Sequence, residues 1–171
     1  MNNRTRLASL SLARAASGVA GTGLAFLAIT SPPEARTASR NKAAVAAKFD
    51  HWSAGIGNPF ELLTDEASWT IEGNSVASKT YATKEDFLRD VIRPFNARLS
   101  LGIRPSVKSI TPEGDRVVIH FDARGMAKDG EPYVNTYAWF FRMQRGRVVQ
   151  ASAFFDAIGF NDLWARVAPS E

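Results

Sequence analysis

Two adjacent segments near the C-terminus carry side chains that could bind or transform a small molecule. Residues 133–156 alternate aromatic and polar side chains and contain a turn signal at Arg145-Gly146. Pairing across a two-residue turn places nine side chains on one face of a hairpin: Tyr133, Asn135, Tyr137, Trp139, Phe141, Gln150, Ser152, Phe154 and Asp156. Aromatic rings mixed with an amide, two phenols and a carboxylate suit a ligand pocket better than a plain core or surface.

Asp156 is the candidate general acid or base. It follows Phe154 and Phe155 and precedes Ile158 and Phe160. Burial among such residues disfavours a charged carboxylate, which suits proton transfer. The alternative is an aspartate that caps the end of the last strand and hydrogen-bonds to backbone groups. The residues alone leave both interpretations open.

His120 is a second candidate for catalysis, with the ability to relay a proton near neutral pH. A hairpin turn at Asp129-Gly130 puts it opposite Trp139, and a turn two residues earlier puts it opposite Asn135. Both registers place it on the face of Tyr137, although a one-residue slip or bulge would separate them. The alternative is a half-exposed histidine on a polar face.

Asn135 and Tyr137 are candidates to orient a ligand oxygen, or else form a buried polar pair satisfied within the sheet. Five aromatic side chains are expected to form the wall of the pocket: Trp69, Tyr81, Tyr133, Trp139 and Phe154. Packing in the core is an equally simple role for Trp69. The chain has only two histidines and no cysteine. Thiolate chemistry is therefore excluded, and we expect no metal and no organic cofactor.

These side chains require a sheet behind a layer of helices. Val45, Phe49 and Trp52 form an apolar stripe that predicts a helix over residues 41–54. Asn58-Pro59 starts a short helix that extends into residues 63–66, and Thr83 starts another that Pro94 should kink. Strands are expected over residues 68–72, 103–110, 116–124 and 133–156. Helices followed by a run of antiparallel strands indicate an α+β fold.

The predicted strand from Tyr133 to Met143 is apolar on both sides, with Val134, Ala138 and Phe140 opposite the pocket face. Because a small domain has little to cover a second apolar face, we expect a homodimer. The formal net charge is +4, but the basic residues of the domain are dispersed without the stripe that binds a phosphate backbone. We therefore expect no nucleic-acid partner.

Residues 1–38 are expected to lie outside the domain. They start with Arg4, Arg6 and Arg14, continue with an acid-free apolar stretch, and end in small residues near Ala35 and Ala38. This layout predicts a secretory signal peptide and a periplasmic or secreted protein. The apolar stretch is too weak for a stable membrane anchor. The alternative is a disordered leader, in which case the protein is cytoplasmic.

The order of motifs resembles the SnoaL-like branch of the nuclear transport factor 2-like superfamily. The similarity lies in W-T-I-E-G at 69–73, G-D-R-V-V at 114–118, G-E-P-Y-V-N-T-Y-A-W-F-F-R at 130–142 and F-F-D at 154–156. It implies a domain over residues 44–165 with a cone-shaped α+β barrel. In that fold a curved, mainly antiparallel sheet is wrapped by about three helices around an apolar pocket, and dimers are common.

The resemblance also implies a role for three residues. In the cyclases of the family a late aspartate acts as acid and base near a histidine and an asparagine, which match Asp156, His120 and Asn135 here. The family's last strand often reads Glu-Tyr-x-Asp, where this chain has Ala153-Phe154-Phe155-Asp156. Two functions stay open. One is cofactor-free isomerase or cyclase chemistry on a small hydrophobic molecule with Asp156 as proton shuttle, and the other is an exported, non-catalytic ligand-binding or dimerisation module.

Overall fold

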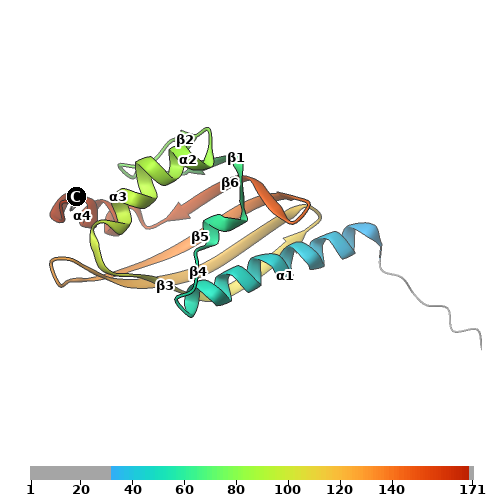
Figure 1. Ribbon diagram of the computed structural model, residues 1–171, viewed down its shortest axis with the longest axis horizontal. Helices are drawn as coiled ribbons and strands as arrows, with labels where there is room; N and C mark the ends of the chain where they lie inside the picture. The colour runs from blue at the N-terminus through green and yellow to red at the C-terminus, as the bar shows by residue number, and fades with distance from the viewer. Residues whose placement is uncertain (1–31, 170–171) are drawn as a thin grey trace, which may run out of the picture. The chain divides into compact units, whose positions relative to one another are not determined.

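The computed structural model describes residues 32–169, which form one mixed sheet and the helices packed against it (Figure 1). The strands follow the order β2-β1-β6-β5-β4-β3 across the sheet. Their bounds are β1 (Leu63–Ile71), β2 (Thr80–Tyr81), β3 (Leu99–Glu113), β4 (Arg116–Ala127), β5 (Pro132–Gln144) and β6 (Arg147–Phe155). Only the pair of β1 and β6 is parallel. The expected α+β class and mainly antiparallel sheet are confirmed.

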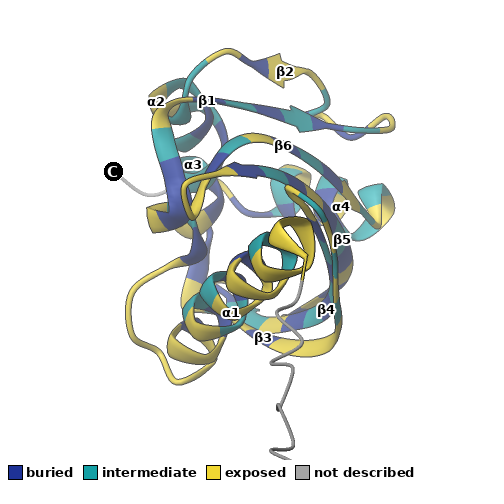
Figure 2. Ribbon diagram, turned by 90° about the vertical axis from the view of Figure 1, so that its right-hand side faces the viewer, coloured by how far each residue is buried: buried dark blue, intermediate teal, exposed yellow. Residues whose placement is uncertain are grey.

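The helical segments lie mostly on the concave side of the sheet. They are α1 (Pro33–Ser53), η1 (Pro59–Leu62), α2 (Lys84–Phe87), η2 (Leu88–Ile92), α3 (Arg93–Asn96) and α4 (Ala157–Arg166). Figure 2 shows the sheet curling from β1 to β3 around α1, with α2 and α3 closing the open side. The sheet remains unclosed, because β2 and β3 are edge strands. The result is the expected cone-shaped α+β fold.

Helix α1 is held on the sheet by the stripe that predicts it. Val45, Phe49 and Trp52 are all buried, and the Phe49 ring lies 5.0 Å from Phe121 of β4. The helix begins earlier than residue 41, at Pro33, whose fixed φ suits a first helical turn. Its first buried side chain is Asn41, so the turns before residue 41 place no side chain in the core.

The chain leaves α1 through a capped single turn. The Asn58 side chain accepts a hydrogen bond from the Phe60 N–H, and Glu61 completes the capping box. The short helix predicted from Asn58-Pro59 is confirmed at its start, but its extension over residues 63–66 is wrong. Leu63 already belongs to β1, where alternate burial and pairing with β6 favour extended backbone.

Pro94 interrupts the next helix as predicted. Because proline lacks an N–H, it cannot donate to the carbonyl four residues earlier. The preceding turns widen into the π-helix η2, in which the Arg93 N–H donates to the Leu88 carbonyl. The turn from α2 to α3 thereby keeps Phe87, Val91 and Phe95 buried against the sheet.

The β4–β5 hairpin differs from both expected registers. Ala127 accepts from the Gly130 N–H and donates to the Glu131 carbonyl, and Gly130 has a φ of +90°. This is a type I turn closed by a glycine bulge, with an odd number of loop residues. The odd number shifts the pairing, so that Phe121 lies opposite Tyr137 and His120 opposite Ala138.

The predicted β5–β6 turn is confirmed, but the pairing of the strands beyond it is shifted by one residue from the predicted register. Arg145 and Gly146 both have positive φ, and Gln144 pairs with Arg147 as expected. Beyond Met143 the strand β6 contains one extra residue, Val149, which forms a bulge. The bulge turns the rest of β6 over. As a result Ala151, Ala153 and Phe155 face the inside, and Gln150, Ser152 and Phe154 face the outside.

The predicted leader lies outside the described residues up to residue 31. Its expected boundary at residue 38 falls inside α1, between Pro33 and the first buried side chain. None of the helices within residues 32–169 combines the length and apolar character needed to cross a membrane.

Candidate ligand pocket

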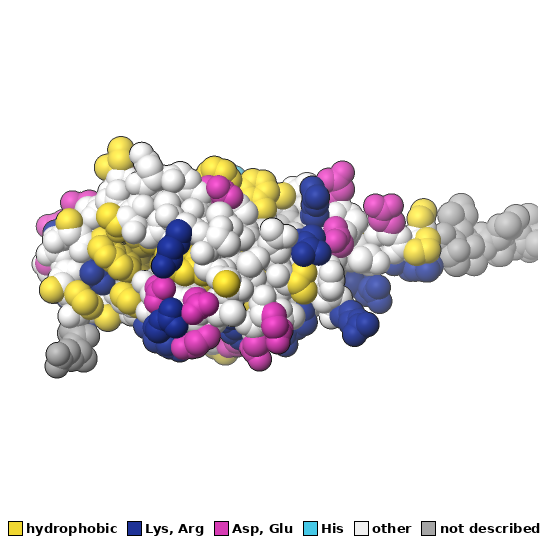
Figure 3. Space-filling view, turned by 90° about the horizontal axis from the view of Figure 1, so that it is seen from above, with side chains coloured by type: hydrophobic (Ala, Val, Ile, Leu, Met, Phe, Trp, Pro, Cys, Tyr) yellow, Lys and Arg dark blue, Asp and Glu magenta, His cyan; other side chains and the backbone are white. Residues whose placement is uncertain are grey.

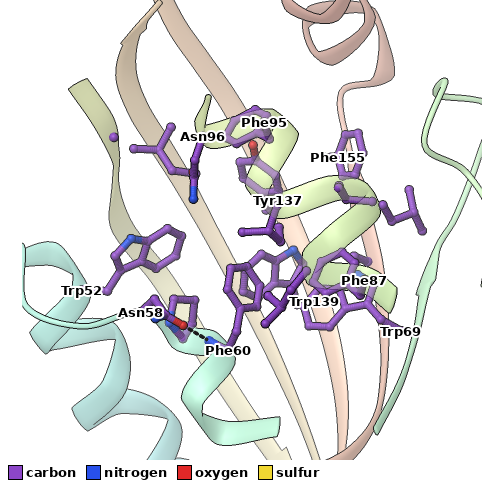
Figure 4. Close-up of a pocket in the computed structure, with 18 of the residues that line it drawn as sticks. Trp52, Asn58, Phe60, Trp69, Phe87, Phe95, Asn96, Tyr137, Trp139 and Phe155 are labelled. Carbon is purple, nitrogen blue, oxygen red and sulfur yellow. Dashed lines mark hydrogen bonds between the residues drawn. The ribbon is translucent and has the colours of Figure 1, made fainter. Parts of the chain in front are cut away.

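A cavity of about 480 Å³ lies between the inner face of the sheet and the helices (Figure 4). Strands β1, β5 and β6 form its floor, and η1, α2, η2 and α3 form its walls, with the start of β3 at the rim. Its aromatic lining is Trp52, Phe60, Trp69, Phe87, Phe95, Tyr137, Trp139, Phe155 and Phe160. A cavity of this size and composition is typical of sites for small organic molecules.

The aromatic walls pack against one another as well as facing the cavity. Trp69 stacks on Phe87 at 4.3 Å between ring centroids, and Trp139 meets Trp69 edge to face at 5.1 Å. The Phe60 ring closes the third side, 5.7 Å from Trp69 and 5.4 Å from Phe87. Since these rings brace each other, the cavity is preformed rather than created by a bound molecule.

A short chain of polar groups connects the pocket to the end of β6. The Asn135 amide donates to the Tyr133 oxygen at 2.9 Å, and the Tyr133 and Tyr137 oxygens are 2.9 Å apart. Burial raises the pKa of Tyr133 to about 12, and burial raises the pKa of Tyr137 well above its ordinary value. Both phenols are therefore protonated at neutral pH.

The hydrogen-bonded groups of Asn135, Tyr133 and Tyr137 include one O–H donor without an acceptor. The Tyr133 oxygen already accepts from Asn135, so the contact between the phenols uses one of their two protons. No other acceptor among residues 32–169 lies within hydrogen-bonding distance of either hydroxyl. When Tyr133 donates to Tyr137, the proton of Tyr137 is free for an oxygen in the pocket.

Asp156 does not line the cavity. It is exposed and caps α4, with its carboxylate accepting from the Ile158 N–H at 2.9 Å. Its backbone N–H donates to Asn135 at 2.9 Å, and its carbonyl accepts from the Asn135 amide at 3.0 Å. The burial among phenylalanines expected for a proton shuttle is wrong, because the Val149 bulge moves the even-numbered end of β6 outward and Asp156 begins α4. The alternative of a carboxylate hydrogen-bonded to backbone is confirmed, but the element that it caps is the helix α4 and not the strand.

His120 lies on the opposite face of the sheet from Tyr137, so its expected place on that face, opposite Trp139 or Asn135, is wrong. The reason is the odd-length β4–β5 loop, which moves all even-numbered residues of β4 outward. Asp122 follows it, accepting from Lys108 at 2.6 Å and from Thr136 at 2.7 Å. The hydrogen bond from Lys108 lowers the pKa of that carboxyl.

Of the other predicted wall residues, Trp69, Tyr137 and Trp139 line the cavity. Tyr133 is buried behind it, and Tyr81 is buried with its hydroxyl donating to the Ala77 carbonyl at 2.7 Å. Phe154 is half exposed on the outer face, so its predicted place in the pocket wall is wrong. The Val149 bulge exchanges it for its neighbour Phe155.

Several lining residues were missed by the sequence reasoning. Trp52, Phe87 and Phe95 belong to apolar helical stripes, and such stripes signal the core without separating cavity wall from packing. Asn58, Asn96 and Arg104 also line the cavity. No carboxylate or imidazole belongs to its lining among residues 32–169, and no cluster of histidine and acidic side chains there is suited to a metal ion.

Comparisons with other proteins agree with this architecture. The family model of the SnoaL-like domain matches residues 45–151. Bal32a, from a soil-derived mobile gene cassette, superposes with a TM-score of 0.61 at 18% identity, covering 75% of this chain and 98% of Bal32a. A protein from Jannaschia sp. CCS1 assigned to the SnoaL-like polyketide cyclases gives 0.57 at 20% identity, covering 80% and 97%.

TerC, co-crystallized with polyporic acid, gives a TM-score of 0.59 at 16% identity, covering 74% of this chain and 98% of TerC. At these identities the structural likeness establishes the fold alone. No curated protein matches the sequence. The match of the family model over most of the domain, together with the cone-shaped sheet and its pocket, shows that the chain belongs to the SnoaL-like domain family.

Proposed function

We propose that the domain binds a small, largely apolar molecule in its aromatic cavity and directs one oxygen of that molecule to Tyr137. The observation that carries the proposal is a preformed cavity of about 480 Å³ with one spare phenol donor beside it. A carbonyl or a similar acceptor would complete the hydrogen bonds of the Asn135–Tyr133–Tyr137 chain. Leaving such a buried donor without an acceptor costs about 1–3 kcal/mol.

One structural neighbour supports a small organic molecule as the ligand. TerC was co-crystallized with polyporic acid, and this chain shares its fold over 98% of the TerC length. The similarity supports a small-molecule pocket in this fold, while the identity of the ligand depends on side chains that differ between the two proteins.

The proposal is tested with the neutral fluorescent probe N-phenyl-1-naphthylamine, whose emission rises in apolar sites. Gly102 lies at the rim, and a Cβ there meets no atom within 4 Å. A phenylalanine at this position therefore obstructs the entrance without disturbing the core. We expect saturable binding by the wild type, at least tenfold weaker binding by Gly102→Phe, and unchanged binding by the control Gly102→Ala.

Equal binding by all three proteins would place the probe elsewhere, for example on the exposed rings of Phe140 and Phe154, and would refute the pocket proposal. A folded Gly102→Phe variant is verified by its circular dichroism spectrum before the titration.

Acid–base catalysis of the isomerase or cyclase type receives less support from the geometry. Among the described residues the cavity offers phenol and amide groups to hold a developing oxyanion, but no carboxylate or imidazole to move a proton. The Asp156→Asn variant keeps a capping side chain and removes the carboxylate. Unchanged turnover of any substrate found for the protein would count against Asp156 as the shuttle, and a loss of 100-fold or more would reinstate it.

We also propose that the outer face of the sheet forms a homodimer. Phe140 and Phe154 are 43% and 50% exposed, and their rings meet at 5.9 Å, with Val134 (49% exposed) on the same face. A second copy of the chain would remove this apolar surface from water. Size-exclusion chromatography with light scattering should give twice the monomer mass, and Phe140→Glu should give the monomer.

Export through a signal peptide is likewise a proposal. Cleavage near Ala35 or Ala38 would remove no buried side chain of α1, because the first one is Asn41. The domain would therefore keep its core after cleavage. N-terminal sequencing of protein purified from its own host decides between a mature chain that begins near these alanines and one that begins at Met1.

A further inference from the structure

Arg104 is the one charged side chain in the lining of the cavity among residues 32–169. It lies on the edge strand β3 opposite Arg124, which starts its side chain on the outer side, and its guanidinium reaches around the strand to the loop after α1. A Cβ on Gly55 would lie 2.9 Å from its Nη2 atom, so the glycine makes room for the guanidinium. Gly55 also has a φ of +85°, which disfavours other residues at this position.

The positive charge of Arg104 has no acidic partner. None of the ion pairs within residues 32–169 includes it, and its one hydrogen bond is a 3.5 Å contact with the Ile103 carbonyl. Some other arginines of the domain are paired, such as Arg93 with Glu85 at 2.8 Å and Arg166 with Asp162 at 2.8 Å. A free cation beside apolar walls attracts an anion more strongly than one surrounded by water.

The acid nearest in the chain to this rim is already engaged. Glu61 packs against Gly57, but it pairs with Lys48 at 2.6 Å and accepts from the Asn58 N–H at 3.3 Å. The Asn58 side-chain oxygen accepts from Phe60, which leaves its amide N–H groups as donors. Asn96 adds a second amide from the opposite wall, as Figure 4 shows. The rim thus offers donors and a positive charge.

We propose that the ligand of this pocket is amphipathic, with an apolar body in the aromatic cavity and an anionic head group paired with Arg104 at the rim. The inference rests on the proposed function and names the class of molecule that the same site takes. The body meets the rings of Trp69 and Trp139, while the head group remains near solvent. Figure 3 shows hydrophobic side chains gathered on the part of the surface away from the start of α1, with basic and acidic side chains beside them.

The experiment compares two probes that differ by one charged group. These are 1-anilinonaphthalene-8-sulfonate, which is anionic, and N-phenyl-1-naphthylamine, which is neutral and otherwise has the same ring system. Both are titrated into the full-length wild type, Arg104→Gln, Arg104→Lys and Arg124→Gln. Arg124 is the matched control, because it pairs with Arg104 across the sheet, is exposed and does not line the cavity.

We expect Arg104→Gln to weaken binding of the anionic probe about tenfold, the effect of losing one hydrogen-bonded ion pair. Binding of the neutral probe should change less than twofold. Arg104→Lys should retain part of the affinity, and Arg124→Gln should match the wild type. Added salt should weaken the anionic probe alone, because it screens the exposed pair.

The inference is overturned if Arg104→Gln and Arg124→Gln weaken the anionic probe equally, since that result reports net charge only. It is also overturned if the wild type binds both probes with equal affinity, which leaves the pocket proposal intact. If the wild type binds neither probe, the proposed function fails together with the inference. Loss of both probes in Arg104→Gln alone identifies a structural role for the arginine and likewise overturns the inference.

Discussion

The two faces of β5 differ sharply although they share one backbone. On the inner face Asn135, Tyr137, Trp139 and Phe141 are each at most 6% exposed. On the outer face the alternate residues reach 43% at Phe140 and 49% at Val134. The inner face carries buried rings and the two hydrogen-bonded phenols, and the outer face carries His120 and Asp122. Odd-numbered residues of β5 therefore face the cavity and even-numbered residues face outward. A shift of one residue in the pairing of a strand would exchange the side chains at the site.

The largest effect expected from this contrast comes from two adjacent phenylalanines. Phe141→Ala removes a buried ring 6.0 Å from Trp139, and we expect a loss of about 3–5 kcal/mol in the free energy of unfolding. Phe140→Ala removes the same atoms from the exposed face and should cost less than about 1 kcal/mol in dilute protein. Urea denaturation measures both. Equal losses would break the contrast between the faces.

A smaller effect is expected from the adjacent polar residues Asn135, on the inner face of β5, and Thr136, on its outer face. Asn135→Ala leaves the backbone N–H and carbonyl of Asp156 and the Tyr133 oxygen without their side-chain partner, and should cost about 1–3 kcal/mol. Thr136→Val is the outer control, since the Thr136 hydroxyl bonds only to Asp122, and it should cost less than about 0.5 kcal/mol. Thermal unfolding of the two variants gives the comparison, and a costlier Thr136→Val would contradict it.

Two variants at Asp156 distinguish a helix-capping role from a role that requires the negative charge. Asp156→Ala should lower the free energy of unfolding by about 1 kcal/mol, the usual cost of losing an N-cap, whereas Asp156→Asn should be nearly neutral. Denaturant titration at neutral pH measures the difference. Similar large losses in both variants would mean that the negative charge itself is needed, which a capping role does not require.

The loss of stability at alkaline pH is expected to reflect the buried phenols of the inner face. The pKa of Tyr133 is about 12 in the folded protein because of burial, against about 10 for an unfolded phenol. Between these values the folded state holds more protons than the unfolded state, so stability is complete below about pH 10 and falls as pH rises towards 12. Tyr133→Phe should flatten the fall.

Phenolate absorbance checks the same point directly. Burial raises the pKa of Tyr81, Tyr133 and Tyr137, and these are the three tyrosines of the chain. No tyrosine should therefore ionise with the ordinary pKa of about 10 before the protein unfolds. A phenol that titrates normally would show that one of these side chains is open to water.

Periodicity and turn chemistry predicted the fold and part of the pocket. The helical stripe of Val45, Phe49 and Trp52 and the Arg145-Gly146 turn each reported a local preference that the folded chain keeps. Trp69, Tyr137 and Trp139 were correctly expected to line the pocket. The places of His120, Phe154 and Asp156 were not, because each depends on a count of residues rather than on residue type.

Neither the three-residue β4–β5 loop nor the Val149 bulge has a clear signal in the sequence. Asp129-Gly130 is compatible with a two-residue turn and with a three-residue turn closed by a glycine bulge, and only the pairing of the whole strand selects one. The bulge at Val149 involves an ordinary strand residue. Arg104 has no period or motif to mark it. Its place at the rim comes from the meeting of β3 with the loop after α1.

The Val149 bulge has a consequence for how β6 could diverge. Deleting this one residue would restore a regular ladder in which Ala151, Ala153 and Phe155 keep their partners on β5 and stay on the inner face. The bulge thus absorbs a change of one residue in the length of β6, whereas pairing Val149 with Arg142 would bring Gln150 and Ser152 to the inner face in place of two alanines. Relatives with the same scaffold could therefore differ by one residue in the length of β6 at this point and still present the same wall to a ligand.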